Sequence, residues 1–221
     1  MRKTETYEIH RQSLSEQVYY YIKRLILSGE IKGGQRVPEE KVARQFGVSR
    51  TPIREALKRL EEYGLIQIKP RSYAVVVALE PHEAGQLAII RSQLEILSVE
   101  LLTDCGTNED FNELDELARE CNALIAAGDI ATTFEKDSRL HLEIAHRTGN
   151  RHLYEIFERL DAKIQLLRLV LRLPLKKLKL YVKHHDDIIA AMQRGDKELA
   201  VTLMKHHIMN QLEDYEKVKR K

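Results

Sequence analysis

The stretch VARQFGVSRTPIREALKRLEEYGLI, residues 42–66, contains the most specific pattern in this chain. Apolar residues recur at helical spacing on both sides of Gly47, and this glycine supplies a tight turn between the two segments. Pro52 lies close to the start of the second segment, where a first helical turn tolerates it. Small or apolar residues occupy the positions at which two crossing helices would meet: Ala43, Val48, Ile53, Ala56 and Leu57. The pattern predicts a helix-turn-helix.

Polar residues are concentrated in the first turn of the second predicted helix. In a helix-turn-helix this turn meets base edges and phosphates. Arginine can hold guanine with two hydrogen bonds, and hydroxyl groups suit phosphate. The candidate DNA-binding residues are therefore Ser49, Arg50, Thr51 and Arg54. The alternative interpretation is an ordinary helical hairpin with a solvated basic face.

The surrounding sequence extends this pattern to a winged helix-turn-helix at residues 1–79. Ser13 and Glu16 form a capping box before a helix at about 14–28, and a second short helix is expected at 39–46. After Gly64 the period changes to that of two short strands, around 65–69 and 73–78, joined by a tip at 70–72. Ser49 or Thr51 is expected to cap the helix that follows Gly47.

Beyond Glu80-Pro81 only helical patterns occur, which predicts a second, all-helical domain at residues 80–221. Its helices are expected near 82–104, 108–127, 130–148, 151–172, 175–194 and 196–219. The chain is thus expected to be mainly α, with one small β-hairpin.

Charge is distributed unevenly between the two predicted domains. Residues 1–79 contain 15 Lys and Arg and 9 Asp and Glu, a formal charge of +6, whereas residues 80–221 contain 21 and 25, a charge of −4. A basic end agrees with binding to a polyanion such as DNA. A chance imbalance of solvated charges is the alternative.

Residues 14–78 resemble the GntR family of bacterial regulators. The resemblance implies that the second helix of the helix-turn-helix enters the major groove and that Arg50, Arg54 and Lys41 contact an operator. At the hairpin tip the family commonly has a Pro-Asn-Arg-Gly type of sequence, whereas this chain has Pro70-Arg71-Ser72-Tyr73; Arg71 is still expected to meet phosphate. The matching residues are VYYYIK (18–23), LSG (27–29), PEE (38–40), VSRTPIREAL (48–57) and LEEYGLI (60–66).

Eight of the nine histidines follow residue 80, so their positions on helical faces are informative. At 100° per residue, Asp137 and His141 are neighbours on the inward face of one predicted helix. His185 and His207 lie on the apolar faces of two others, whereas His146 lies on a polar face. One carboxylate and three imidazoles are a sound ligand set for a divalent transition metal. Separately satisfied core histidines are the alternative.

Residues 81–215 resemble the FCD effector domain of FadR-type regulators, on Asp137-x-x-x-His141, Gly149-Asn150, His185-x-x-Ile188, Gly195-Asp196 and His207. The resemblance implies a metal held by Asp137, His141, His185 and His207 and completed by an effector carboxylate. Zinc is the first choice, with nickel and manganese as alternatives. Leu140 replaces a phenylalanine common in the family. Arg91, at the edge of an apolar stripe, is expected either to extend to solvent or to grip that carboxylate.

Together these patterns predict a metabolite-responsive transcriptional regulator that binds a palindromic operator as a homodimer and is not an enzyme. A metal-sensing regulator and, less favoured, a metal-dependent hydrolase are the alternatives. No apolar run of 18 residues exists and residues 1–12 lack the apolar core of a secretory signal, so we expect a cytoplasmic protein without membrane contact. Cys105 and Cys121 lack metal-site spacing and do not demand a disulfide.

Overall fold

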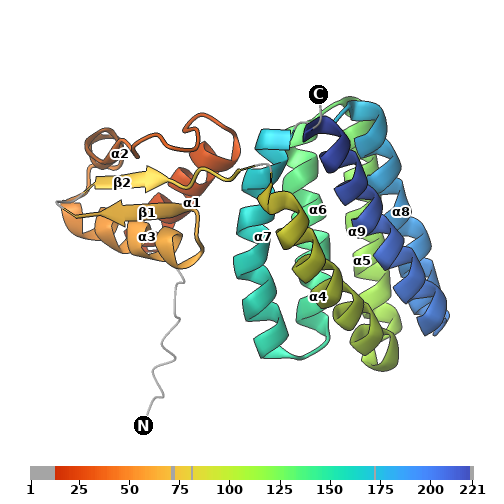
Figure 1. Ribbon diagram of the computed structural model, residues 1–221. Helices are drawn as coiled ribbons and strands as arrows, with labels where there is room; N and C mark the ends of the chain where they lie inside the picture. Colours follow the sequence, from red (N-terminus) through yellow and green to blue (C-terminus); the bar gives the residue numbers. More distant parts are fainter. Residues whose placement is uncertain (1–12, 71–72, 81, 172, 220–221) are drawn as a thin grey trace, which may run out of the picture. The chain divides into compact units, whose positions relative to one another are not determined.

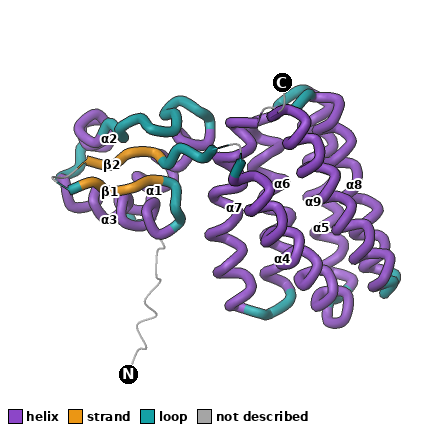
Figure 2. Tube along the Cα trace, viewed as in Figure 1, coloured by secondary structure: helices purple, strands orange, loops and turns teal. Residues whose placement is uncertain are grey.

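The computed structural model describes residues 13–70, 73–80, 82–171 and 173–219. The chain forms two compact units that meet between Val77 and Ala78. The sequence places this boundary two residues later, after Leu79. Each unit is considered by itself below (Figures 1 and 2).

The N-terminal unit has the element order of a winged helix-turn-helix. Its elements are α1 (Leu14–Leu27), α2 (Glu39–Phe46), α3 (Arg50–Glu62), β1 (Ile66–Lys69) and β2 (Tyr73–Val76). β1 and β2 pair antiparallel, with Ile66 opposite Val76 and Lys69 opposite Tyr73. The core lies between α1 and α3, where the apolar stripe of each helix is buried. Its fully buried members include Val18, Ile22, Ile26, Leu60, Leu65 and Ile66.

Local sequence explains where these elements begin and end. Ser13 caps α1 through its hydroxyl, which accepts a hydrogen bond from the backbone N–H of Glu16 at 3.1 Å. Gly47 ends α2 in the left-handed conformation with φ of 62°, which glycine adopts without a steric penalty. Ser49 is the N-cap residue of α3 by position, but its side chain makes no capping hydrogen bond.

The C-terminal unit is a bundle of helices. They are α4 (Glu83–Cys105), α5 (Asn108–Ala127), α6 (Ile130–Arg147), α7 (Arg151–Leu171), α8 (Leu175–Gln193) and α9 (Lys197–Lys219). α4 packs along α9, and α5 packs between α6 and α8. Among the described residues, no helix has both the length and the apolar character that a bilayer crossing requires. Cys105 and Cys121 are both free thiols.

The main core of this bundle joins α4, α5, α6, α8 and α9. It includes Val99, Leu102, Phe111, Leu114, Leu140, Ile144, Ile188 and Met204. Thirteen polar or charged residues of the described chain are buried as well, all of them in this unit. Burying polar groups costs free energy unless they are paired, so these residues mark the place where a site should be sought.

Candidate functional site

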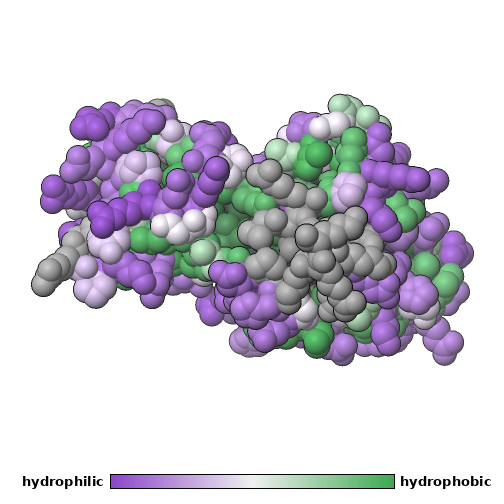
Figure 3. Space-filling view, turned by 45° about the horizontal axis from the view of Figure 1, so that its top comes forward, coloured by the Kyte–Doolittle hydropathy of each residue, from purple (hydrophilic) through white to green (hydrophobic). Residues whose placement is uncertain are grey.

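The first turn of α3 exposes the side chains that the sequence assigns to DNA. Arg50, Thr51 and Arg54 are exposed, whereas Ile53 and Ala56 on the opposite side of the helix are buried. The apolar side anchors α3 to the unit, and the polar side is left for a ligand. Figure 3 shows that hydrophilic side chains cover much of this unit.

An open groove of about 840 Å³ runs along this polar side. The candidates Lys41, Arg50 and Arg54 line it. It is also lined by Arg36, Arg44 and Tyr73, which the sequence analysis does not select. Arg36 and Tyr73 lie outside the helix-turn-helix motif, so a motif match alone cannot find them. Arg71 lies outside the described residues.

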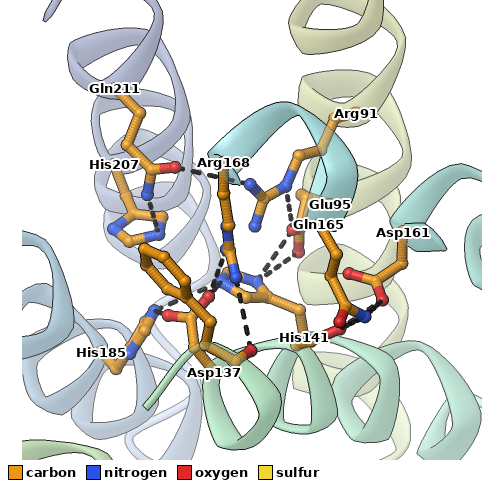
Figure 4. A network of polar contacts seen from close by, with 12 residues as sticks. Arg91, Glu95, Asp137, His141, Asp161, Gln165, Arg168, His185, His207 and Gln211 are labelled. Atoms are coloured by element: carbon orange, nitrogen blue, oxygen red, sulfur yellow. Dashed lines mark hydrogen bonds and ion pairs between the residues drawn. The ribbon is translucent and has the colours of Figure 1, made fainter. Parts of the chain in front are cut away.

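Three histidines from three helices meet inside the C-terminal unit (Figure 4). His141 comes from α6, His185 from α8 and His207 from α9, and one potential ligand atom of each lies within 4.8 Å of the others. All three side chains are buried. The three histidines are therefore not separate from one another, as the metal-site hypothesis expects.

Asp137 adjoins the trio from the preceding turn of α6. Its Oδ1 lies 3.5 Å from Nε2 of His185, while its Oδ2 forms an ion pair with the guanidinium of Arg168 on α7. Burial alone would raise the pKa of Asp137, but Arg168, His141 and His185 lower it below its ordinary value, so the group is a carboxylate. Oδ2 is thus held by Arg168 and lies 3.9 Å from Nε2 of His141, while Oδ1 faces His185.

Glu95 on α4 orients the ring of His141. Its carboxylate oxygens lie 2.8 and 2.9 Å from Nδ1 of His141, and the glutamate is completely buried. Burial opposes ionisation of Glu95, but His141 and Arg91 lower its pKa below the ordinary value. A carboxylate only accepts hydrogen bonds, so Nδ1 of His141 donates to Glu95, and Nε2 is the nitrogen turned toward His185.

The side-chain amide of Gln211 contacts the ring of His207. Nε2 of His207 lies 2.9 Å from the amide nitrogen of Gln211, which can only donate, so Nε2 of His207 is unprotonated. Burial lowers the pKa of His185 to about 3 and that of His207 well below its ordinary value, which keeps both rings neutral. Neutral imidazole is the form that binds a metal.

The trio also leaves hydrogen-bonding capacity unused. Nδ1 of His185 and Nδ1 of His207 have no partner among the described residues, and Nε2 of His185 lies only 3.3 Å from Nε2 of His141. Buried polar atoms without partners are costly, so these two Nδ1 nitrogens mark a place that packing alone leaves unsatisfied. Three buried imidazoles beside a carboxylate are a donor set that a divalent metal accepts, so the residues present fit one.

Arg91 is buried, with 4% of its surface exposed, so the alternative in which it extends to solvent is wrong. Its Nε donates to Glu95 at 3.0 Å and its Nη1 to the side-chain carbonyl of Gln211 at 3.4 Å. Arg91 thereby connects the residue that orients His141 with the residue that contacts His207. Glu95, Arg168 and Gln211 are not found by sequence reasoning, because each acts through another side chain rather than through a motif.

The space beside these groups is small. A cavity of about 20 Å³ adjoins Asp137, Arg168 and Gln211, and its other walls include Phe134, Leu173 and Tyr181. Such a volume holds about one water molecule. A larger ligand does not fit into this cavity as the described residues form it.

The chain matches two family models in tandem. The model of the bacterial regulatory proteins of the gntR family matches residues 14–76, and that of the FCD domain matches residues 86–210. The second match alone spans more than half of the chain.

Curated relatives and a solved structure resemble the chain along most of its length. The HTH-type transcriptional regulator YdhC of Bacillus subtilis is 29% identical over 87% of this chain and 85% of the relative. The gluconate operon transcriptional repressor of Bacillus licheniformis is 27% identical over 86% and 80%. The HTH-type transcriptional regulator McbR of Escherichia coli is 28% identical over 84% and 85%. The solved structure of McbR superimposes with a TM-score of 0.82 at 25% identity, covering 94% of this chain and 99% of that one.

Proposed function

Because the chain belongs to the GntR family of bacterial regulators and has an FCD domain, we propose that it is a repressor or activator whose operator binding responds to a small carboxylate. Its relatives are transcriptional regulators, so the chain is a DNA-binding regulator and not an enzyme. These relatives give no support to the alternative of a metal-dependent hydrolase.

The observation that carries the proposal is the buried cluster of His141, His185 and His207 beside Asp137. We infer that these four residues hold one divalent ion, with zinc as the first choice, because three imidazoles and one carboxylate suit it. Bound there, the ion would supply open coordination positions and positive charge. A carboxylate oxygen suits both, and Arg91, which contacts the residues that touch His141 and His207, is the proposed partner of the second oxygen.

The name of one relative agrees with this class of effector. The Bacillus licheniformis protein is the repressor of a gluconate operon, and gluconate is a hydroxycarboxylate. The cavity of about 20 Å³ indicates that such an acid enters only when the helices around it separate. Binding would therefore change the packing of the bundle, and a changed bundle can alter DNA affinity through a shift between two states.

We further propose that the regulator binds a palindromic operator as a homodimer in the cytoplasm, with one helix-turn-helix for each half-site. Lys41, Ser49, Arg50, Thr51 and Arg54 are then the DNA-contacting set, joined by Arg71 at the hairpin tip. The basic groove beside α3 supports this assignment.

Fluorescence anisotropy with a duplex recovered by in vitro selection tests the effector proposal. The protein is first stripped with a chelator and then loaded with zinc. Addition of gluconate, citrate or lactate to the loaded protein should change the operator affinity at constant metal. Affinity that follows the metal concentration alone, with no response to any acid in a wide panel, would instead favour the metal-sensing alternative.

A further inference from the structure

The segment before α2 is joined to the hairpin by an isolated β-bridge. The backbone N–H of Gly34 donates to the carbonyl of Val76, and that of Val37 donates to the carbonyl of Ala74, both at 2.9 Å. Arg36 is thereby paired opposite Val75 in antiparallel register. The backbone of Arg36 is fixed by its pairing with the hairpin, so the position of its Cα is well defined.

Arg36 and Tyr73 form a stacked pair on one face of this sheet. Arg36 is paired with Val75, and Tyr73 lies two residues from Val75 on the same strand. The side chains of Arg36 and Tyr73 therefore leave the sheet on the same side. The guanidinium carbon of Arg36 lies 3.9 Å from the centre of the Tyr73 ring. Stacking uses only the flat face of the guanidinium, so its N–H edges stay available. Within the described residues no acidic side chain forms an ion pair with Arg36, which is exposed.

The stacked pair lines the same groove as the first turn of α3. Lys41, Arg50 and Arg54 line that groove too, so Arg36 adds a cation at the hairpin side of the proposed DNA surface. Two acids, Glu39 and Glu40, also line the groove, and Glu39 has a structural role. Its carboxylate accepts a hydrogen bond from the backbone N–H of Ala74 at 3.2 Å, which ties the start of α2 to the hairpin.

We propose that Arg36, held on the ring of Tyr73, is a phosphate anchor beside the tip end of the hairpin. A guanidinium matches two phosphate oxygens with parallel hydrogen bonds, and stacking restricts its rotamers before DNA arrives. The contact would position the duplex against α3 without reading bases. The anchor role of Arg36 depends on DNA binding by this family and not on the proposed effector. If Arg36 proves not to contact phosphate, the effector proposal is unaffected.

Salt-dependent binding of the full chain to two probes tests the assignment. The probes are a duplex recovered by in vitro selection and an unselected duplex of equal length. Arg36→Ala should weaken binding to both by a similar factor, roughly tenfold at physiological salt. It should also reduce the slope of log affinity against log salt by about 0.9 for each bound protomer. Tyr73→Leu should weaken both probes less and leave the slope unchanged, because the cation remains.

Two further arginines are matched controls. Arg59 stacks on Tyr19 at 4.2 Å in the same unit but does not line the groove, so Arg59→Ala should leave the salt slope unchanged. Arg54→Ala should weaken the selected duplex far more than the unselected one, because Arg54 is assigned to base edges. An Arg36→Ala protein with parental melting temperature and unchanged slope would overturn the proposal. Loss confined to the selected duplex would also overturn it, since Arg36 would then read bases.

Discussion

The carboxylate of Glu95 on α4 contacts Nδ1 of His141 on α6 at 2.8 Å, although the two residues are 46 positions apart. A carboxylate in this position fixes the ring orientation, leaves the lone pair on Nε2 and increases the basicity of that nitrogen. Arg91 compensates the charge of the glutamate at 3.0 Å. The orientation of a proposed metal ligand is thus set by a helix that supplies no ligand itself.

Glu95→Gln should weaken zinc binding, since an amide oxygen is a poorer acceptor than a carboxylate. Outer partners of ligating histidines typically account for a 10- to 100-fold change in metal affinity. Competition with a chelating dye measures the affinity, and ¹⁵N spectra of the imidazoles report the tautomer of His141 in the metal-free protein. Gln93→Ala, an exposed change on the same helix, is the control. Unchanged affinity together with an unchanged tautomer would remove the positioning role of Glu95.

Replacement of two proposed ligands should abolish the metal site. We expect about one divalent ion per chain in the parent and less than a tenth of that in a His185→Ala, His207→Ala double variant, since four ligands become two. Elemental analysis after gel filtration measures the stoichiometry. His146→Ala is the matched control, because His146 is exposed and packs edge-on against Tyr154 at 5.2 Å. A double variant that keeps the parental metal content would contradict the assignment.

Arg91→Ala should reduce the affinity for a carboxylate effector, because it removes the only buried cation on α4 beside the site. Loss of a charge-assisted hydrogen bond of this kind costs about 1.5–3 kcal/mol, roughly a 10- to 100-fold change. Calorimetric titration of the zinc-loaded protein with the acid found in the effector screen gives the affinity.

DNA binding by the effector-free Arg91→Ala protein should stay at the parental level. The same variant leaves Glu95 buried beside His141 without its cation, so the melting temperature is measured in parallel. Parental affinity for the acid would leave Arg91 with a purely structural role.

The metal-free protein should lose stability as the pH falls below about 6.5. The pKa of His185 is about 3 in the folded chain and about 6.5 in an unfolded one, so between these values only the unfolded state binds the proton. His207 shifts in the same direction. The lowered pKa of Asp137 acts only below about pH 4, where the unfolded carboxyl becomes protonated.

Calorimetry or denaturant unfolding of the chelated protein at intervals from pH 7 to pH 5 tests this dependence. Each buried histidine contributes a slope of up to about 1.4 kcal/mol per pH unit below its unfolded pKa. His185→Ala should remove one such contribution, and His146→Ala should remove none. A free energy of unfolding that is constant across this range would show that the two rings are not kept neutral by burial.

Sequence patterns were sufficient for the order of elements and for the faces of the helices. Gly47, the apolar spacing of α3 and the basic first turn predict a helix-turn-helix, because each of these signals depends on residues a few positions apart. The inward positions of Asp137, His141, His185 and His207 follow in the same way from a period of 3.6 residues. Family membership, shown by the matched models, agrees with the helix-turn-helix prediction.

The tertiary structure decided which of these side chains meet and what completes the site. Periodicity gives the direction of a side chain around its own helix, but it carries no information on the register between two helices. The meeting of His141, His185 and His207 therefore depends on the packing of α6, α8 and α9. Glu95 contacts His141, 46 positions away, and Arg168 contacts Asp137, 31 positions away. Arg36 and Tyr73, which stack on each other, are 37 positions apart. No local sequence pattern links the partners in any of these contacts.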